Sequence, residues 1–251
     1  MYITLPQRSD GFGAQFLHIM RALVFVEESN NAFLFMGIDS MISHSTDDSD
    51  RQYIEKVIDY MNIRQYYITP KDLSNNTEYL VLPEVITFYH LFCQRFEELH
   101  ASYAFKRYKK IFLHGKVNPY DTNFFNVAIH IRKAEKYQTF NENRPIPDFS
   151  DEYYKSFCKM IRSIYIGSKP LKFHIYSIGE ESVFDYLKND DTEFHINTDM
   201  LDTFSGFVFA DTLLISQSCL SYTAAFLCSG TIYYKYWNHL HIGLKSWVKY
   251  E

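Results

Sequence analysis

The chain has 251 residues, of which 47% are hydrophobic and 22% charged, a composition typical of soluble globular proteins. Its net charge of -5 and its lack of a long Lys/Arg block argue against binding nucleic acid over a broad surface. No apolar run approaches membrane-spanning length, and none of the four cysteines has Cys-x-x-Cys spacing, which argues against a zinc or disulfide framework.

The first part of the sequence is predicted to open with a strand at residues 3–5, a glycine-containing loop at 8–15 and an apolar helix at 15–28. This order often begins a nucleotide or sugar site in an α/β protein. The remaining elements predicted here are strands at 32–36 and 79–82 and helices at 51–61 and 83–112. Residues 115–123 are predicted to connect the two halves.

Strands and helices alternate more cleanly in the second part of the sequence. The predicted strands are 125–131, 172–177, 193–196, 212–216 and 231–234, and the predicted helices are 151–165, 180–187, 200–208 and 221–228. This alternation predicts a largely parallel sheet covered on both faces. We therefore predict an α/β fold of two small Rossmann-like halves, 1–118 and 119–251, whose parallel sheets face a cleft.

Three short segments carry residue types suited to chemistry, and the first is the loop from Asp10 to Gln15. Gly11 and Gly13 allow close backbone approach to a ligand and tolerate positive φ, while Asp10 and Gln15 can bond sugar hydroxyls. Many tight turns share this pattern, so the loop is weak evidence by itself.

The second segment, Val-Ala-Ile-His-Ile-Arg-Lys-Ala-Glu at 127–135, places His130 and Arg132 on one side of a predicted strand. A guanidinium at the carboxyl end of a strand can hold a diphosphate bidentately, and Lys136 could add a second positive charge. Glu135 and Glu142 could line the same pocket, where a carboxylate can act as a general base. Taken alone, the segment fits an ordinary strand end with a surface arginine better than it fits a diphosphate site.

The third segment, 210–225, is an apolar strand that ends in the hydroxyls of Ser216, Ser218 and Ser221, after which a helix begins. Free amides and the positive end of the helix dipole make such a turn suitable for an anion. Equally, Ser221 could be a simple N-cap and Ser218 a turn residue.

In this order the segments resemble the fucosyltransferase-like glycosyltransferases of GT-B architecture, which carry a glycine loop, a His-x-Arg-x-x-Asp type motif and a late Ser-x-x-Ser turn. Within this family, the sequence most resembles small enzymes from bacteria and from large DNA viruses of algae. The resemblance is strong over residues 125–235, fair over 1–40 and slight over 41–115. It implies that Arg132 grips the donor pyrophosphate, that His130 shapes the same pocket, and that Ser218 and Ser221 contact phosphate.

The resemblance also places Ser177 beside the nucleobase and Asp199 near the ribose or base, although helix capping explains Asp199 as well. The acidic position of the motif falls on Glu135, where Ala134-Glu135 replaces the usual Gly-Asp, so the role of this acid stays open. No Asp-x-Asp pair lies at a strand end, and we therefore expect neither a catalytic metal nor a cofactor.

We therefore expect a metal-independent, inverting glycosyltransferase that moves a sugar from GDP-fucose or UDP-xylose to an acceptor glycan. The base candidates are Asp10, Glu135, Glu142 and Asp148, with Asp10 preferred because its loop lies in the half expected to face the acceptor. The alternative is a non-catalytic glycan-binding protein with a decayed transferase fold. A cytoplasmic location is expected, in the host cytoplasm if the source is viral, and the sequence assigns no oligomeric state.

Overall fold

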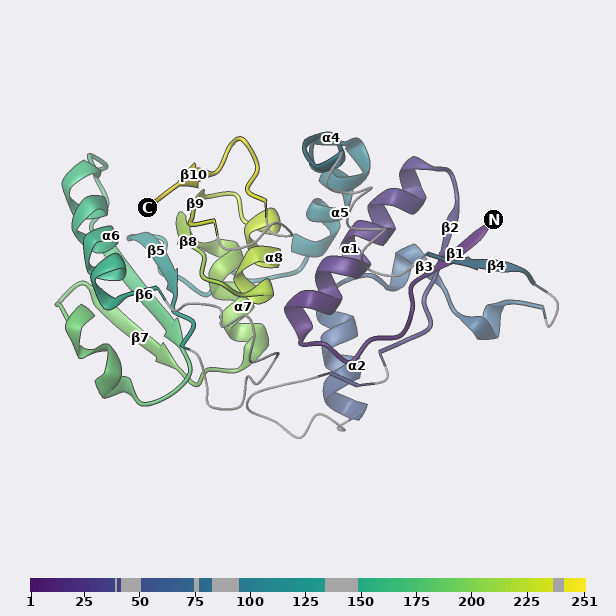
Figure 1. The fold of residues 1–251 in the computed structure, drawn as a ribbon, viewed down its shortest axis with the longest axis horizontal. Coiled ribbons are helices and arrows are strands. Elements are labelled where there is room, and N and C mark those ends of the chain that lie inside the picture. Colours follow the sequence, from purple (N-terminus) through teal and green to yellow (C-terminus); the bar gives the residue numbers. More distant parts are fainter. Residues whose placement is uncertain (39, 42–50, 75–76, 83–94, 134–148, 237–241) are drawn as a thin grey trace. The chain divides into compact units, whose positions relative to one another are not determined.

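The structure is a computed structural model that describes residues 1–38, 40–41, 51–74, 77–82, 95–133, 149–236 and 242–251. The chain divides into two compact units, Met1–Val117 and Asn118–Glu251. Each unit contains a parallel sheet and helices (Figure 1). None of the helices in the described ranges is long and apolar enough to cross a bilayer.

The N-terminal unit is built on a four-stranded sheet with the order β3-β2-β1-β4, in which every pairing is parallel. Its strands are β1 (Tyr2–Thr4), β2 (Ala32–Leu34), β3 (Tyr67–Ile68) and β4 (Tyr79–Val81). Its helices are α1 (Phe12–Glu28), α2 (Arg51–Tyr60), α4 (Phe96–Ala101), α5 (Tyr103–Leu113) and the short 3-10 turns η1 (Arg64–Tyr66) and η2 (Pro70–Asp72).

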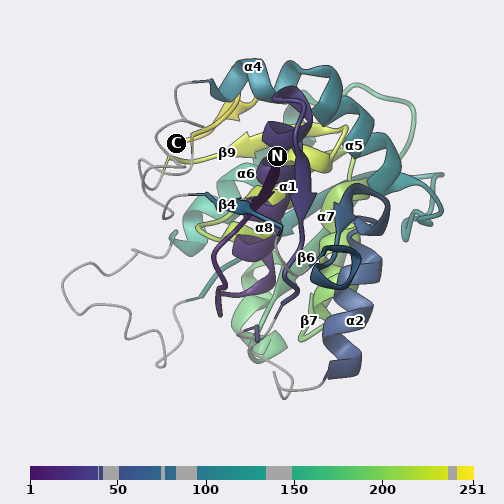
Figure 2. The same ribbon diagram turned by 90° about the vertical axis from the view of Figure 1, so that its right-hand side faces the viewer.

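Helix α1 is buried along most of its length and lies alongside α5 (Figures 1 and 2). The rings of Phe16 and Phe112 are 5.6 Å apart across this contact, and Phe12 packs on Phe16 at 5.3 Å. The helix starts at Phe12 rather than at residue 15 as predicted. Burial of Phe12 explains the difference, because an apolar residue gains free energy by joining the helix that covers the core.

The predicted continuous helix over 83–112 is wrong in the part that the structure describes. Helix α4 ends at Ala101 and α5 begins at Tyr103. Between them Ser102 has an extended backbone, and its side chain accepts a hydrogen bond from the Phe105 amide at 3.2 Å. A serine that caps a new helix satisfies an otherwise unpaired amide, so it starts a second helix rather than continuing the first.

The C-terminal unit is built on a six-stranded sheet with the order β10-β9-β8-β5-β6-β7, again with parallel pairings throughout. Its strands are β5 (Phe125–His130), β6 (Leu171–Ser177), β7 (Thr192–Ile196), β8 (Thr212–Leu214), β9 (Thr231–Tyr234) and β10 (Val248–Lys249). Its helices are α6 (Asp151–Ile164), η3 (Glu181–Leu187), α7 (Met200–Phe209) and α8 (Cys219–Leu227).

The two faces of the central strands differ in chemistry. On one face Val127, Ile129, Phe173 and Ile175 are fully buried in a cluster with residues of α6. On the other face, which α7 and α8 cover, alternate positions carry His130, His174, Tyr176 and other polar groups (Figure 1). Because side chains alternate across a strand, the apolar positions fix the core and leave the polar set on the opposite face.

The helix predicted at 180–187 is the 3-10 helix η3, which begins at Glu181. The helix predicted to begin at residue 221 begins at Cys219. Strand β9 has the predicted bounds, whereas the two-residue strands β3 and β10 were not predicted. Such short strands have too few residues for an alternating pattern to show.

Candidate functional site

The carboxyl end of β5 is joined to the turn before α8 by one buried histidine. His130 is the last residue of β5, and its Nδ1 lies 2.8 Å from the hydroxyl of Ser216 and 2.8 Å from that of Ser221. β5 and β8 are neighbours in a parallel sheet, so their carboxyl ends meet at the same edge. The imidazole therefore connects two segments that the strand order already places side by side.

His130 is uncharged in the folded protein. Burial, with a smaller effect from the positive charge of Arg132, lowers the pKa of His130 to about 3. Its ring also packs against Phe207 at 5.0 Å. A neutral, enclosed imidazole that contacts two hydroxyls is suited to holding the site together, so we regard His130 as a positioning residue. Positive charge at this strand end comes from the basic side chains that follow it.

Arg132 lies two residues beyond the end of β5 and is half-buried. The backbone just before it is held on both sides: the Ile131 amide donates to the Tyr176 carbonyl at 2.9 Å, and the Ser177 hydroxyl donates to the Ile131 carbonyl at 2.8 Å. The next residue, Lys133, forms an ion pair with Asp151 at 2.8 Å. The strand end that carries Arg132 is thus fixed by backbone and side-chain hydrogen bonds.

Ser218, not Ser221, is the N-cap of α8, so the alternative in which Ser221 caps the helix is wrong. The Ser218 hydroxyl accepts from the Leu220 amide at 3.2 Å, and its own amide donates to the Ser216 carbonyl at 2.8 Å. Ser221 is fully buried, and its hydroxyl also accepts from the Ser216 amide at 3.3 Å. Cys219, the first residue of α8, is partly exposed.

Two residues predicted to lie near the nucleotide have local structural partners. Asp199 is the N-cap of α7, and its carboxylate accepts from the Leu201 amide at 2.9 Å, which confirms the capping interpretation. Ser177 ends β6, is buried, and bonds the backbone before Arg132. Their roles at the ribose and nucleobase stay predictions.

The predicted glycine loop begins α1 in the N-terminal unit. Gly11 is the N-cap with φ of -65°, and Gly13 is a buried residue inside the helix, so neither uses the positive φ that its residue type would tolerate. The Asp10 carboxylate forms an ion pair with Arg8. The Gln15 side chain donates to the Asp10 carbonyl at 2.6 Å, which closes the turn.

Four predicted site residues lie outside the described residues, and their roles stay predictions: Glu135, Lys136, Glu142 and Asp148.

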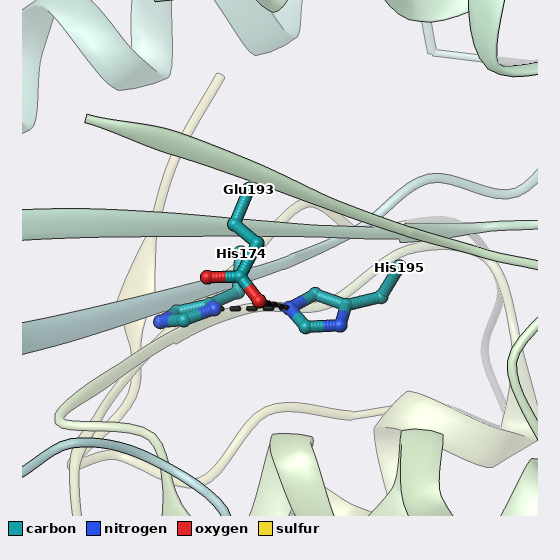
Figure 3. Close-up of side chains that lie close together, drawn as sticks. All are labelled: His174, Glu193 and His195. Carbon is teal, nitrogen blue, oxygen red and sulfur yellow. Dashed lines mark hydrogen bonds and ion pairs between the residues drawn. The ribbon is translucent and has the colours of Figure 1, made fainter. Parts of the chain in front are cut away.

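The structure brings together a further polar cluster that the sequence analysis did not single out. Its members are His174 on β6 and Glu193 and His195 on β7 (Figure 3). They line a cavity of about 350 Å³ in the C-terminal unit. The signal in the sequence was slight, because a histidine within a strand is common and only the pairing of β6 with β7 makes these three residues neighbours.

Comparisons with known proteins give information on the fold. No protein-family model matches this sequence, and a search of curated proteins finds no similar one. Among solved structures, NodZ α-1,6-fucosyltransferase co-crystallized with GDP superposes with a TM-score of 0.51 at 10% identity, covering 90% of this chain and 92% of that one. Arabidopsis thaliana FUT1 in complex with GDP gives 0.47 at 12% identity, covering 95% and 71%. E. coli heptosyltransferase WaaC with ADP gives 0.43 at 9% identity, covering 94% and 87%.

The fold assignment rests on the first of these structures, whose TM-score is above one half. The two parallel-sheet units confirm the predicted α/β class with two Rossmann-like halves, and this architecture matches that of GT-B glycosyltransferases.

The neutral state of His130 predicts a specific pH dependence of stability. Because its folded pKa of about 3 lies below the unfolded value of 6.5, only the unfolded state takes up this proton as the pH falls through that range, and stability is lost. Replacing His130 with Gln should reduce the slope of unfolding free energy against pH between those values by about 1.4 kcal/mol per pH unit. Urea unfolding at a series of pH values measures this slope. A slope in His130→Gln equal to that of the wild type would show that His130 is not buried neutral.

Proposed function

We propose that the chain is a nucleotide-sugar glycosyltransferase that binds the diphosphate of its donor in the C-terminal unit, between Arg132 and the start of α8. The observation that carries this proposal is the hydrogen-bonded junction of His130 with Ser216 and Ser221. This junction links the strand end that precedes Arg132 to a helix N-terminus. The fold shared with a fucosyltransferase co-crystallized with GDP supports the same conclusion.

The chemistry of the two segments suits a diphosphate. The planar guanidinium of Arg132 can donate two parallel hydrogen bonds to phosphate oxygens. The start of α8, partly exposed at Cys219, offers the positive end of the helix dipole. In the proposal Ser218 and Ser221 shape this turn beside the phosphates, and Ser177 and Asp199 border the nucleoside.

The proposed reaction proceeds with inversion. A base removes the proton from an acceptor hydroxyl, whose oxygen attacks the anomeric carbon as the bond to the nucleoside diphosphate breaks. Arg132 and the α8 dipole stabilise the departing negative charge, which is the task that a metal ion performs in other transferases. Asp10 is our first choice of base, followed by Glu135, Glu142 and Asp148. An acceptor glycan completes the reaction.

GDP-fucose is the proposed donor, with UDP-xylose as the alternative. The GDP found in the fucosyltransferase of similar fold supports the guanine nucleotide. Isothermal titration of the full chain with GDP and with UDP tests the choice, and we expect GDP to bind more tightly by at least about tenfold, or 1.4 kcal/mol. Tighter binding of UDP would select the alternative donor. Binding of neither nucleotide would overturn the proposed function.

Arg132→Ala should weaken GDP binding by about 2–3 kcal/mol, roughly 30- to 150-fold, because a charge-assisted contact to phosphate is lost. Arg132→Lys should recover part of the affinity, since an ammonium keeps the charge but not the bidentate geometry. The matched control is Lys133→Ala, which removes a neighbouring positive charge that already has Asp151 as its partner. Equal dissociation constants for wild type and Arg132→Ala would reject the role of Arg132.

Asp10→Ala should lower the turnover number by about 10²- to 10⁴-fold if Asp10 is the base, while GDP affinity stays unchanged. Asp10→Asn keeps the shape but removes the basic oxygen and should lose a similar factor. Transfer assays with a panel of nucleotide sugars measure both variants. Near-normal turnover in a folded Asp10→Ala variant would pass the role to one of the other three carboxylates.

The same assays test the alternative function. Glycan binding by the wild type without any consumption of donor would indicate a non-catalytic glycan-binding protein.

A further inference from the structure

The cluster of His174, Glu193 and His195 follows from the register of two adjacent strands. His174 on β6 pairs with Glu193 on β7, and Tyr176 pairs with His195. Paired residues of parallel strands, and residues two apart, share one face of a sheet. All three side chains therefore project from the polar face of the C-terminal sheet and point toward one another (Figure 3).

The spacing of their donor atoms suits a single metal ion. Nδ1 of His174 lies 3.0 Å from Nε2 of His195, which lies 3.6 Å from Oε1 of Glu193. One ligand atom from each residue falls within 4.8 Å of the others. A tetrahedral ion with bonds of about 2.0–2.1 Å separates its ligand atoms by about 3.3 Å. The distances of 3.0 and 3.6 Å lie on either side of that value, so small side-chain adjustments would complete the geometry.

Asn126, which lies outside the cluster, determines which ring nitrogen of His174 carries the proton. The side-chain amide nitrogen of Asn126 donates to the carbonyls of Asp121 and Phe124 at 3.0 and 3.2 Å, so its oxygen is the atom that lies 3.0 Å from Nε2 of His174. Since that oxygen only accepts, Nε2 carries the proton and Nδ1 presents its lone pair to the cluster. Metal-binding histidines are held in this way by a partner on the other nitrogen.

Aromatic contacts hold both imidazoles in place. The His195 ring stacks on Tyr176 at 4.5 Å with 10° between the planes, and the His174 ring packs on Tyr120 at 4.2 Å. The two tyrosine hydroxyls are 2.9 Å apart, and that of Tyr120 donates to the Gly206 carbonyl at 2.8 Å. These contacts fix the ring positions before any ion binds, which reduces the entropy lost on binding.

We propose that His174, Glu193 and His195 bind one divalent transition-metal ion of the zinc type, with a fourth coordination position open to the cavity of about 350 Å³ that they line. Two imidazoles favour zinc over magnesium or calcium, which prefer oxygen ligands. Three protein ligands leave one position for water or an anionic group of a bound molecule. The second oxygen of Glu193 lies 3.6 Å from Lys172, so the first remains available to the ion.

None of the three ligands belongs to the proposed diphosphate-binding set. The cluster also has a competing interpretation in which the two histidines simply share a hydrogen bond on a sheet face. The experiment must therefore measure metal binding itself and not transferase activity.

The test uses the full chain without a polyhistidine tag, dialysed against EDTA and then against metal-free buffer. Calorimetric titration with Zn²⁺ should give one site per chain, and Mg²⁺ should give none. Co²⁺ should produce the visible absorption of a four-coordinate ion, and added Zn²⁺ should abolish it. The melting temperature should rise with Zn²⁺ concentration, because the ion binds the folded state.

Glu193→Gln and His195→Ala should each weaken Zn²⁺ binding by at least about tenfold and remove the four-coordinate cobalt spectrum. Glu193 is exposed and its replacement is isosteric, so this variant remains informative if His195→Ala folds poorly. The matched control, His114→Ala, removes an exposed histidine of the N-terminal unit and should bind Zn²⁺ like wild type. Absence of Zn²⁺ binding, or one-site binding that survives both cluster variants, would overturn the proposal and leave a hydrogen-bonded histidine pair.

Discussion

The contact of the His130 imidazole with the hydroxyls of Ser216 and Ser221 holds the proposed donor site together. A charged imidazole would lose much of its hydration in this buried place, and the fold therefore keeps it neutral. The neutral ring still supplies a polar nitrogen for the two serines. This junction ties the end of β5, which Arg132 follows, to the turn from which α8 starts, and the hydrogen bonds of Ile131 to Tyr176 and Ser177 fix the strand end beside it.

The C-terminal sheet separates its tasks between its two faces. The face against α6 is an apolar core that includes Val127 and Phe173, and its burial supplies the main free energy that holds the strands in register. The opposite face then presents polar groups in fixed places without contributing much to that core. Because β7 is an edge strand, Glu193 stays exposed while His174, one strand inward, is buried. The proposed diphosphate site thus lies at the strand ends of this sheet, and the proposed metal site lies on its polar face.

The second half of the sequence was the more predictable one. Its strands and helices differ in hydrophobic periodicity and alternate along the chain. β6 and β9 therefore lie close to where the sequence pattern predicts them. The helix over 83–112 was predicted as continuous because hydrophobic periodicity continues across Ser102, whereas the capping bond of that serine restarts the helix. The glycines of the first loop tolerate a left-handed backbone, yet Gly11 begins a helix at ordinary φ. The type of a residue shows which backbone conformations it tolerates but not which one it adopts.

By itself the sequence determined the α/β class, the position of Arg132 just after a strand, and a serine turn before a late helix. These features depend on local periodicity and on the preferences of residues for caps and turns. Only the tertiary structure decided that Ser218 caps α8 while Ser221 turns inward to His130, a residue 91 positions away in the sequence. It alone decided that His174 and His195, 21 residues apart, lie in contact. The reason is that strand order and register are set by the packing of the whole unit, which no local pattern encodes.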